Sequence, residues 1–127
     1  MFKDLIYLTV IITIIDFTYL TSISKTFNSI IYKIQNSKLE IRFLGVLLCY
    51  ISLVLSLFYF IIKKNGTIFD AFLLGLFIYA VFETTNYALL KKWPFYIMVL
   101  DTIWGGILFA LTTYLFYLFK NKRIVFF

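Results

Sequence analysis

Histidine is absent from this chain of 127 residues, and cysteine and proline occur once each. Without histidine, the chain lacks the commonest zinc ligand and the commonest general base. Its single cysteine, Cys49, cannot form an internal disulfide. There is also no glycine-rich phosphate loop, no Ser/His/Asp set and no Cys/His spacing for zinc. The sequence therefore predicts no cofactor and no catalytic residue, and it leaves the presence of a metal open.

Charged residues are scarce as well. They make up 14% of the chain, against 63% for hydrophobic residues, whereas a soluble domain is typically about 25% charged. The chain has too little polar surface for a soluble domain, so we predict an integral membrane protein. Its net charge of +6 comes from lysine and arginine residues at the ends of apolar segments. Anionic lipid headgroups, and not nucleic acid, are therefore the expected partners.

Four apolar windows are long enough to cross a bilayer, since a span needs roughly 20 residues for a hydrocarbon core about 30 Å thick. They are 5–24, 43–62, 67–90 and 95–119. Because lipid offers the backbone no hydrogen-bonding partner, and because these runs lack the alternation of barrel strands, we expect helices. The whole chain, 1–127, is then one all-α domain, a four-helix transmembrane bundle.

The first span is expected to be retained, because the apolar run after Lys3 is longer than the core of a cleavable signal and no small-x-small site follows it. An even number of spans places the N- and C-termini on the same side of the membrane. The 12 lysine and arginine residues divide evenly between the two predicted faces, so the orientation of the bundle stays open.

The connection 25–42, between the first two spans, is the only one long enough to have structure of its own. Its apolar residues from Phe27 to Ile34 follow an i, i+3, i+4, i+7 pattern. This pattern predicts a short amphipathic helix that lies in the membrane interface and ends near Asn36. At the other end of the chain, the apolar residues 124–127 are expected to fold back onto the membrane surface.

Small residues predict where helices approach one another closely, which is how helices associate inside lipid. Gly105 and Gly106 are interpreted in this way. The second window carries a longer stripe of small residues: Gly45, Cys49, Ser52 and Ser56. We expect this stripe to pack against a neighbouring helix.

The third and fourth windows are predicted to form a tight hairpin around a turn at Trp93 and Pro94, which marks a membrane interface. Asp16, Glu83 and Asp101 each lie about six to eight residues from a predicted span end on that same face. At 1.5 Å per residue their carboxyl groups share a layer roughly 9 to 12 Å deep. No lysine or arginine lies at this depth, where a charge costs on the order of 3 kcal/mol.

Two interpretations of this acidic layer compete. The carboxyl groups can be protonated and hold the bundle together by hydrogen bonds. Alternatively, they line a proton- or cation-accepting site that opens toward Trp93. The predicted residues of this site are Asp16, Glu83, Asn86 and Asp101. The predicted supporting aromatic residues are Tyr79, Trp93 and Trp104.

The motifs around this layer strongly resemble a known family. They are Tyr79-x-x-x-Glu83-x-Thr85-Asn86-Tyr87-Ala88-x-Leu90-Lys91-x-Trp93-Pro94, followed by Asp101-x-x-Trp104-Gly105. The chain resembles the predicted membrane proteins catalogued as domain of unknown function 2177. That resemblance implies a four-span bundle with an aspartate late in the first span, matched here by Asp16, and it implies no activity. Glu83 departs from the family, which usually has Asp at that position.

Two functions are therefore expected for this multi-pass protein. One is a small transporter or channel-like protein that uses the carboxylate site. The other is a structural or accessory protein, either a subunit of a larger membrane assembly or a component of a viral or organellar membrane. Four short helices leave little room for an internal pathway, so a homo-oligomer or a larger complex is expected in either case. Paired carboxyl groups can in principle catalyse hydrolysis, but this short chain has little room for a substrate site that is open to water, so an enzyme is not the expected function.

Overall fold

The computed structural model describes all 127 residues and contains only helices. Helix α1 comprises Phe2–Gln35, α2 comprises Phe43–Leu57, and a π-helical turn, η1, continues α2 over Phe58–Ile62. Helices α3 and α4 follow at Ile68–Leu89 and Phe95–Phe119. By length and composition, α1, α2 with η1, α3 and α4 can each cross a membrane. The predicted all-α architecture with four candidate spans is confirmed.

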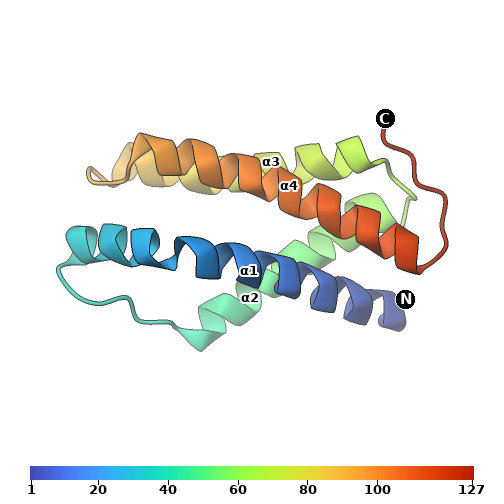
Figure 1. Ribbon diagram of the computed structural model, residues 1–127, viewed down its shortest axis with the longest axis horizontal. Helices are drawn as coiled ribbons and strands as arrows, with labels where there is room; N and C mark the ends of the chain where they lie inside the picture. Colours follow the sequence, from blue (N-terminus) through green and yellow to red (C-terminus); the bar gives the residue numbers. More distant parts are fainter.

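Helices α3 and α4 form the predicted hairpin and lie side by side along their whole length (Figure 1). Glycine makes this approach possible. A Cβ added at Gly75 would overlap the carbonyl oxygen of Gly105, and one added at Gly105 would overlap the ring of Tyr79. Gly106 faces Phe72 in the same way. The interpretation of the glycine pair as helix packing is confirmed.

Helix α1 is longer than predicted, and the prediction of a separate interfacial helix after it is wrong. The chain stays helical from Phe2 to Gln35. The helix ends at Asn36, which adopts a left-handed conformation with φ 58°. No proline or glycine interrupts this stretch. Its apolar residues pack against protein and not against headgroups, because Ile30 forms a buried cluster with Trp93 and Ile97.

Helix α2 crosses α1 at an angle and joins the core mainly through its C-terminal half (Figure 1). Leu53, Val54 and Leu57 are buried there. The stripe of small residues lies largely on the part that diverges. A Cβ added at Gly45 would have no atom within 4 Å, and Cys49 and Ser52 are exposed. The expected close packing of this stripe against a helix is therefore wrong, since the tilt of α2 carries it away from its neighbours.

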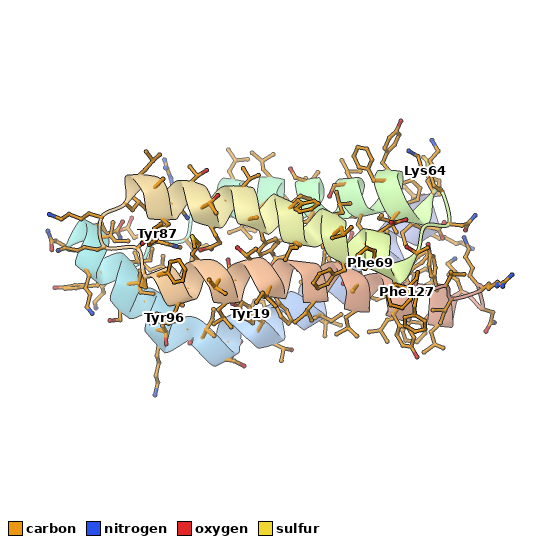
Figure 2. The ribbon with its side chains drawn as sticks, turned by 90° about the horizontal axis from the view of Figure 1, so that it is seen from above. Tyr19, Lys64, Phe69, Tyr87, Tyr96 and Phe127 are labelled. Carbon is orange, nitrogen blue, oxygen red and sulfur yellow. The ribbon has the colours of Figure 1, made fainter.

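The C-terminal tail folds back onto the start of α3, and its location on the membrane surface stays a prediction. The N–H groups of Ile68 and Phe69, at the start of α3, donate to the carbonyl oxygens of Val125 and Phe126. Phe127 packs against Phe69, and both are labelled in Figure 2. The tail thus satisfies backbone donors that the first turn of a helix leaves free.

Both chain ends lie at the same end of the bundle (Figure 1). Lys120, after α4, forms an ion pair with Asp4 in the first turn of α1, with 3.0 Å between Nζ and Oδ1. This ammonium group lowers the pKa of the Asp4 carboxyl below its usual value of 3.8. The location of both termini on one side of a membrane stays a prediction.

Candidate functional site

Three carboxyl groups are buried inside the bundle, one from each of α1, α3 and α4. Asp16 and Asp101 are each 6% exposed, and Glu83 is 0% exposed. The groups that donate to them belong to tyrosine and tryptophan side chains. No lysine or arginine neutralises them, so each carboxyl depends on neutral donors in an apolar setting.

Helices α1 and α4 are joined by a reciprocal pair of hydrogen bonds. Tyr19 Oη, on α1, donates to Asp101 Oδ1 on α4 at 3.0 Å. Trp104 Nε1, on α4, donates to Asp16 Oδ1 on α1 at 3.0 Å. The two aromatic rings stack with centroids 4.3 Å apart and planes 5° from parallel. Each helix thus supplies an acid and, three residues later, the aromatic donor for the acid of the other helix.

A further donor comes from α2. Tyr50 Oη donates to Asp16 Oδ2, so both oxygens of Asp16 accept hydrogen bonds, from α4 and from α2. Asp16 therefore connects α1 to two other helices. This arrangement holds the loosely packed α2 against the bundle at the level of the acids.

Glu83 is bonded at one oxygen only. Trp93 Nε1 donates to Glu83 Oε1 at 2.8 Å, whereas Oε2 is buried without any donor. The Asp101 carboxyl lies close enough to Glu83 for the two groups to influence each other. Two carboxyl groups in contact can form a hydrogen bond only if one of them carries a proton. The pair of Glu83 and Asp101 is the most unusual polar contact in the bundle.

Trp93 closes this pair off at the hairpin turn. It was expected at the headgroup level, but its side chain is buried and packs edge-on to Phe27 of α1, with centroids 6.0 Å apart. The indole N–H is therefore directed to a buried carboxyl and not to the interface. The C-terminal extension of α1 makes this burial possible.

The structure bears on two details of the predicted site, the role of Asn86 and the depth of the acids. Asn86 is half-buried and makes none of the hydrogen bonds of the acids; its backbone carbonyl instead accepts from the N–H of Leu90 at the end of α3. The predicted common depth of the acids assumes that the first span ends at residue 24, whereas α1 continues to Gln35; a shared layer within a membrane stays a prediction. No three carboxylate, thiol or imidazole side chains are placed to hold a metal ion.

The predicted set of site residues omits two donors, Tyr19 and Tyr50. A signal for the first was available, because Asp16-x-x-Tyr19 repeats the spacing of Asp101-x-x-Trp104. No comparable signal marks Tyr50. Tyr79, predicted as a supporting residue, is half-buried over Gly105.

A comparison with known protein families shows which family the chain belongs to. A family model described as "Predicted membrane protein (DUF2177)" matches residues 1–118. The chain belongs to the DUF2177 family. The resemblance inferred from the motifs is confirmed, and all three buried acids and both tryptophans lie inside the matched DUF2177 region. No curated protein and no solved structure matches the chain. The DUF2177 match supports a multi-pass membrane protein and brings no activity with it.

Proposed function

We propose that this DUF2177 protein uses the pair of Glu83 and Asp101 to accept and release a proton inside the membrane, as part of a small transporter or channel-like protein. The observation that carries the proposal is the buried Oε2 of Glu83, which has no donor although it belongs to a fully buried side chain. A proton held between the two carboxyl groups would satisfy this oxygen.

Electrostatics favours one proton for the pair. Two negative charges in contact repel each other strongly in an apolar environment, and adjacent carboxylates elsewhere share one proton for this reason. No cationic side chain is hydrogen-bonded to either group. Intramembrane acids in such positions commonly serve proton relays. A shared proton is also the one most easily exchanged, because the second carboxyl can take it over.

A proton fits this site better than a metal ion. Both oxygens of Asp16 already accept hydrogen bonds, as does one oxygen each of Glu83 and Asp101. A cation that prefers several oxygen ligands would have to displace these donors. The proton needs only one free oxygen, and Glu83 Oε2 provides it.

The residues around Glu83 and Asp101 define a path for the proton. Asp101 and Tyr19 line a cavity between the helices, and Trp93 covers Glu83 at the hairpin turn. A proton would therefore pass from the cavity to Asp101, then to Glu83, and leave on the Trp93 side. Movement of the Trp93 indole would open that side.

Proton flux into liposomes tests this proposal. Reconstituted wild-type protein, driven by a membrane potential, is expected to change the internal pH faster than protein-free liposomes, whereas Glu83→Gln and Asp101→Asn proteins match the protein-free rate. Asp70→Asn is the matched control, since Asp70 is an exposed acid at the start of α3, and it retains the wild-type rate. Equal flux from wild type and Glu83→Gln would refute the proposal.

The alternative, an accessory subunit of a membrane assembly, is favoured by one observation. The stripe of Gly45, Cys49 and Ser52 is suited to a close helix contact but has no partner within the chain. Native mass measurement in mild detergent separates the two functions. A defined homo-oligomer with proton flux supports the proton site, whereas recovery only with other polypeptides supports the accessory function.

A further inference from the structure

A cavity of about 550 Å³ lies between α1, α2 and α3, within the size range of small-molecule sites, roughly 300–1,000 Å³. Ten of its 14 lining residues are hydrophobic. Two carboxyl groups, those of Asp16 and Asp101, line it together with Tyr50 and Tyr19, whose hydroxyl groups donate to them. Leu20, Val46 and Phe82 also line it and are exposed on the surface of the bundle. The cavity therefore opens sideways, where lipid would surround the helices.

We propose that this cavity binds an organic cation with an apolar body, which enters from the bilayer. The inference goes beyond the proton site, because binding requires no proton flux. The two share Asp101, which lines the cavity and is one half of the proposed proton pair.

Charge selects the ligand. Among the lining residues the carboxyl groups are Asp16 and Asp101, and no lysine or arginine lines the cavity. Asp101 accepts a hydrogen bond from Tyr19 at Oδ1, and when it shares one proton with Glu83 the pair keeps one negative charge beside the cavity. A positive group placed here would supply the counter-charge that the protein omits, and an anion would be repelled.

The walls select an organic cation over an inorganic one. Small metal ions need several oxygen ligands and give up water reluctantly, whereas most of this surface is hydrocarbon. The rings of Tyr19, Tyr50 and Tyr79 lie among the lining residues, beside the acids. Aromatic faces attract organic cations, most strongly where water is excluded.

The small-residue stripe of α2 supplies the space for the apolar body. Gly45, Cys49 and Ser52 all line the cavity. A Cβ at Gly45 would meet nothing within 4 Å, so larger side chains at this position would occupy the cavity without a clash. The stripe that fails to pack against a helix thus forms one wall of the site.

Cys49 makes binding measurable in the unmodified protein, because it is the single cysteine and lines the cavity. In proteoliposomes, its alkylation by N-ethylmaleimide can be followed by intact mass. Tetraphenylphosphonium at ten times its dissociation constant is expected to slow alkylation about tenfold, since roughly one site in eleven is then free. Tetraphenylborate, an anion of the same shape, is expected to leave the rate unchanged.

Two variants extend the test through direct binding of radiolabelled tetraphenylphosphonium. Gly45→Phe, which fills the cavity, is expected to lower the affinity at least about tenfold, a change of about 1.4 kcal/mol. Val81→Phe adds the same ring to an exposed position outside the cavity and is expected to bind like wild type. Asp101→Asn is expected to bind the cation more weakly, by a similar factor.

Several results would overturn the inference. They are equal protection by the anion and the cation, no protection by either, unchanged affinity in Gly45→Phe, and efficient disulfide formation between Cys49 residues of two copies, which would show a protein partner on this face. The proton proposal fails independently of this one, because its test compares the proton flux of the wild type with that of Glu83→Gln. Cation-selective protection without flux refutes only the proton proposal, and flux without such protection refutes only this one.

Discussion

Gly75→Ala is expected to prevent stable pairing of α3 and α4, whereas Gly45→Ala leaves the bundle intact. The added methyl group at Gly75 would overlap the backbone oxygen of Gly105 and lie 2.8 Å from Phe109 Cβ. A backbone oxygen in a helix cannot move aside as a flexible side chain can, so the helices must separate. Overpacking typically costs about 1–3 kcal/mol and occasionally more, and we expect at least the upper end here.

The control for this prediction is unusually well matched, because it makes the same substitution on another candidate span. The open surroundings of Gly45 accept a Cβ, and alanine favours a helix by roughly 1 kcal/mol over glycine. Thermal unfolding in detergent, followed by size-exclusion chromatography, compares the two variants. Equal midpoints for Gly75→Ala and Gly45→Ala would show that α3 and α4 do not approach as described.

Trp104→Phe is expected to lower the stability of the bundle by about 1–3 kcal/mol, the usual effect of leaving a buried polar group without its partner. The phenyl ring keeps much of the stacking on Tyr19, but Asp16 Oδ1 loses its donor. Tyr96→Phe, at an exposed position labelled in Figure 2, is the control and should change little.

The reciprocal arrangement also predicts that its two halves are coupled. Tyr19→Phe removes the hydrogen bond to Asp101, and Trp104→Phe removes the one to Asp16. Because the stacked rings position each other, the double variant should lose less stability than the sum of the single losses, with a coupling of about 0.5–3 kcal/mol. Strict additivity in a double-mutant cycle would mean that the two hydrogen bonds are independent.

The helices could be predicted from the sequence because bilayer thickness fixes the length of an apolar span. Windows 43–62 and 95–119 match α2 with η1 and α4 at both ends. The extension of α1 could not be predicted in this way. Its residues beyond 24 are partly polar, and they stay helical because Ile30 finds a buried partner in Trp93. That contact depends on the position of the hairpin turn, which only the tertiary structure defines.

The acids of the candidate site could also be predicted from the sequence, because the membrane limits which residues a span can contain. A carboxylate in an apolar segment is expensive to bury, so Asp16, Glu83 and Asp101 were conspicuous, and all three are buried. Their donors were less evident, since a tyrosine such as Tyr50 is common at many depths. Asn86 shares a helix face with Glu83 but does not join the acids. Which side chains meet depends on the rotation and tilt of each helix, and the sequence pattern defines these only coarsely.

The proton between Glu83 and Asp101 can be observed directly by infrared spectroscopy of the protein in a bilayer at neutral pH. We predict a carbonyl stretching band of a protonated carboxylic acid, sensitive to exchange into heavy water, that disappears in Glu83→Gln and shifts in Asp101→Asn. Its persistence at unchanged frequency in both variants, or its absence from the wild type, would contradict a proton shared by these two residues.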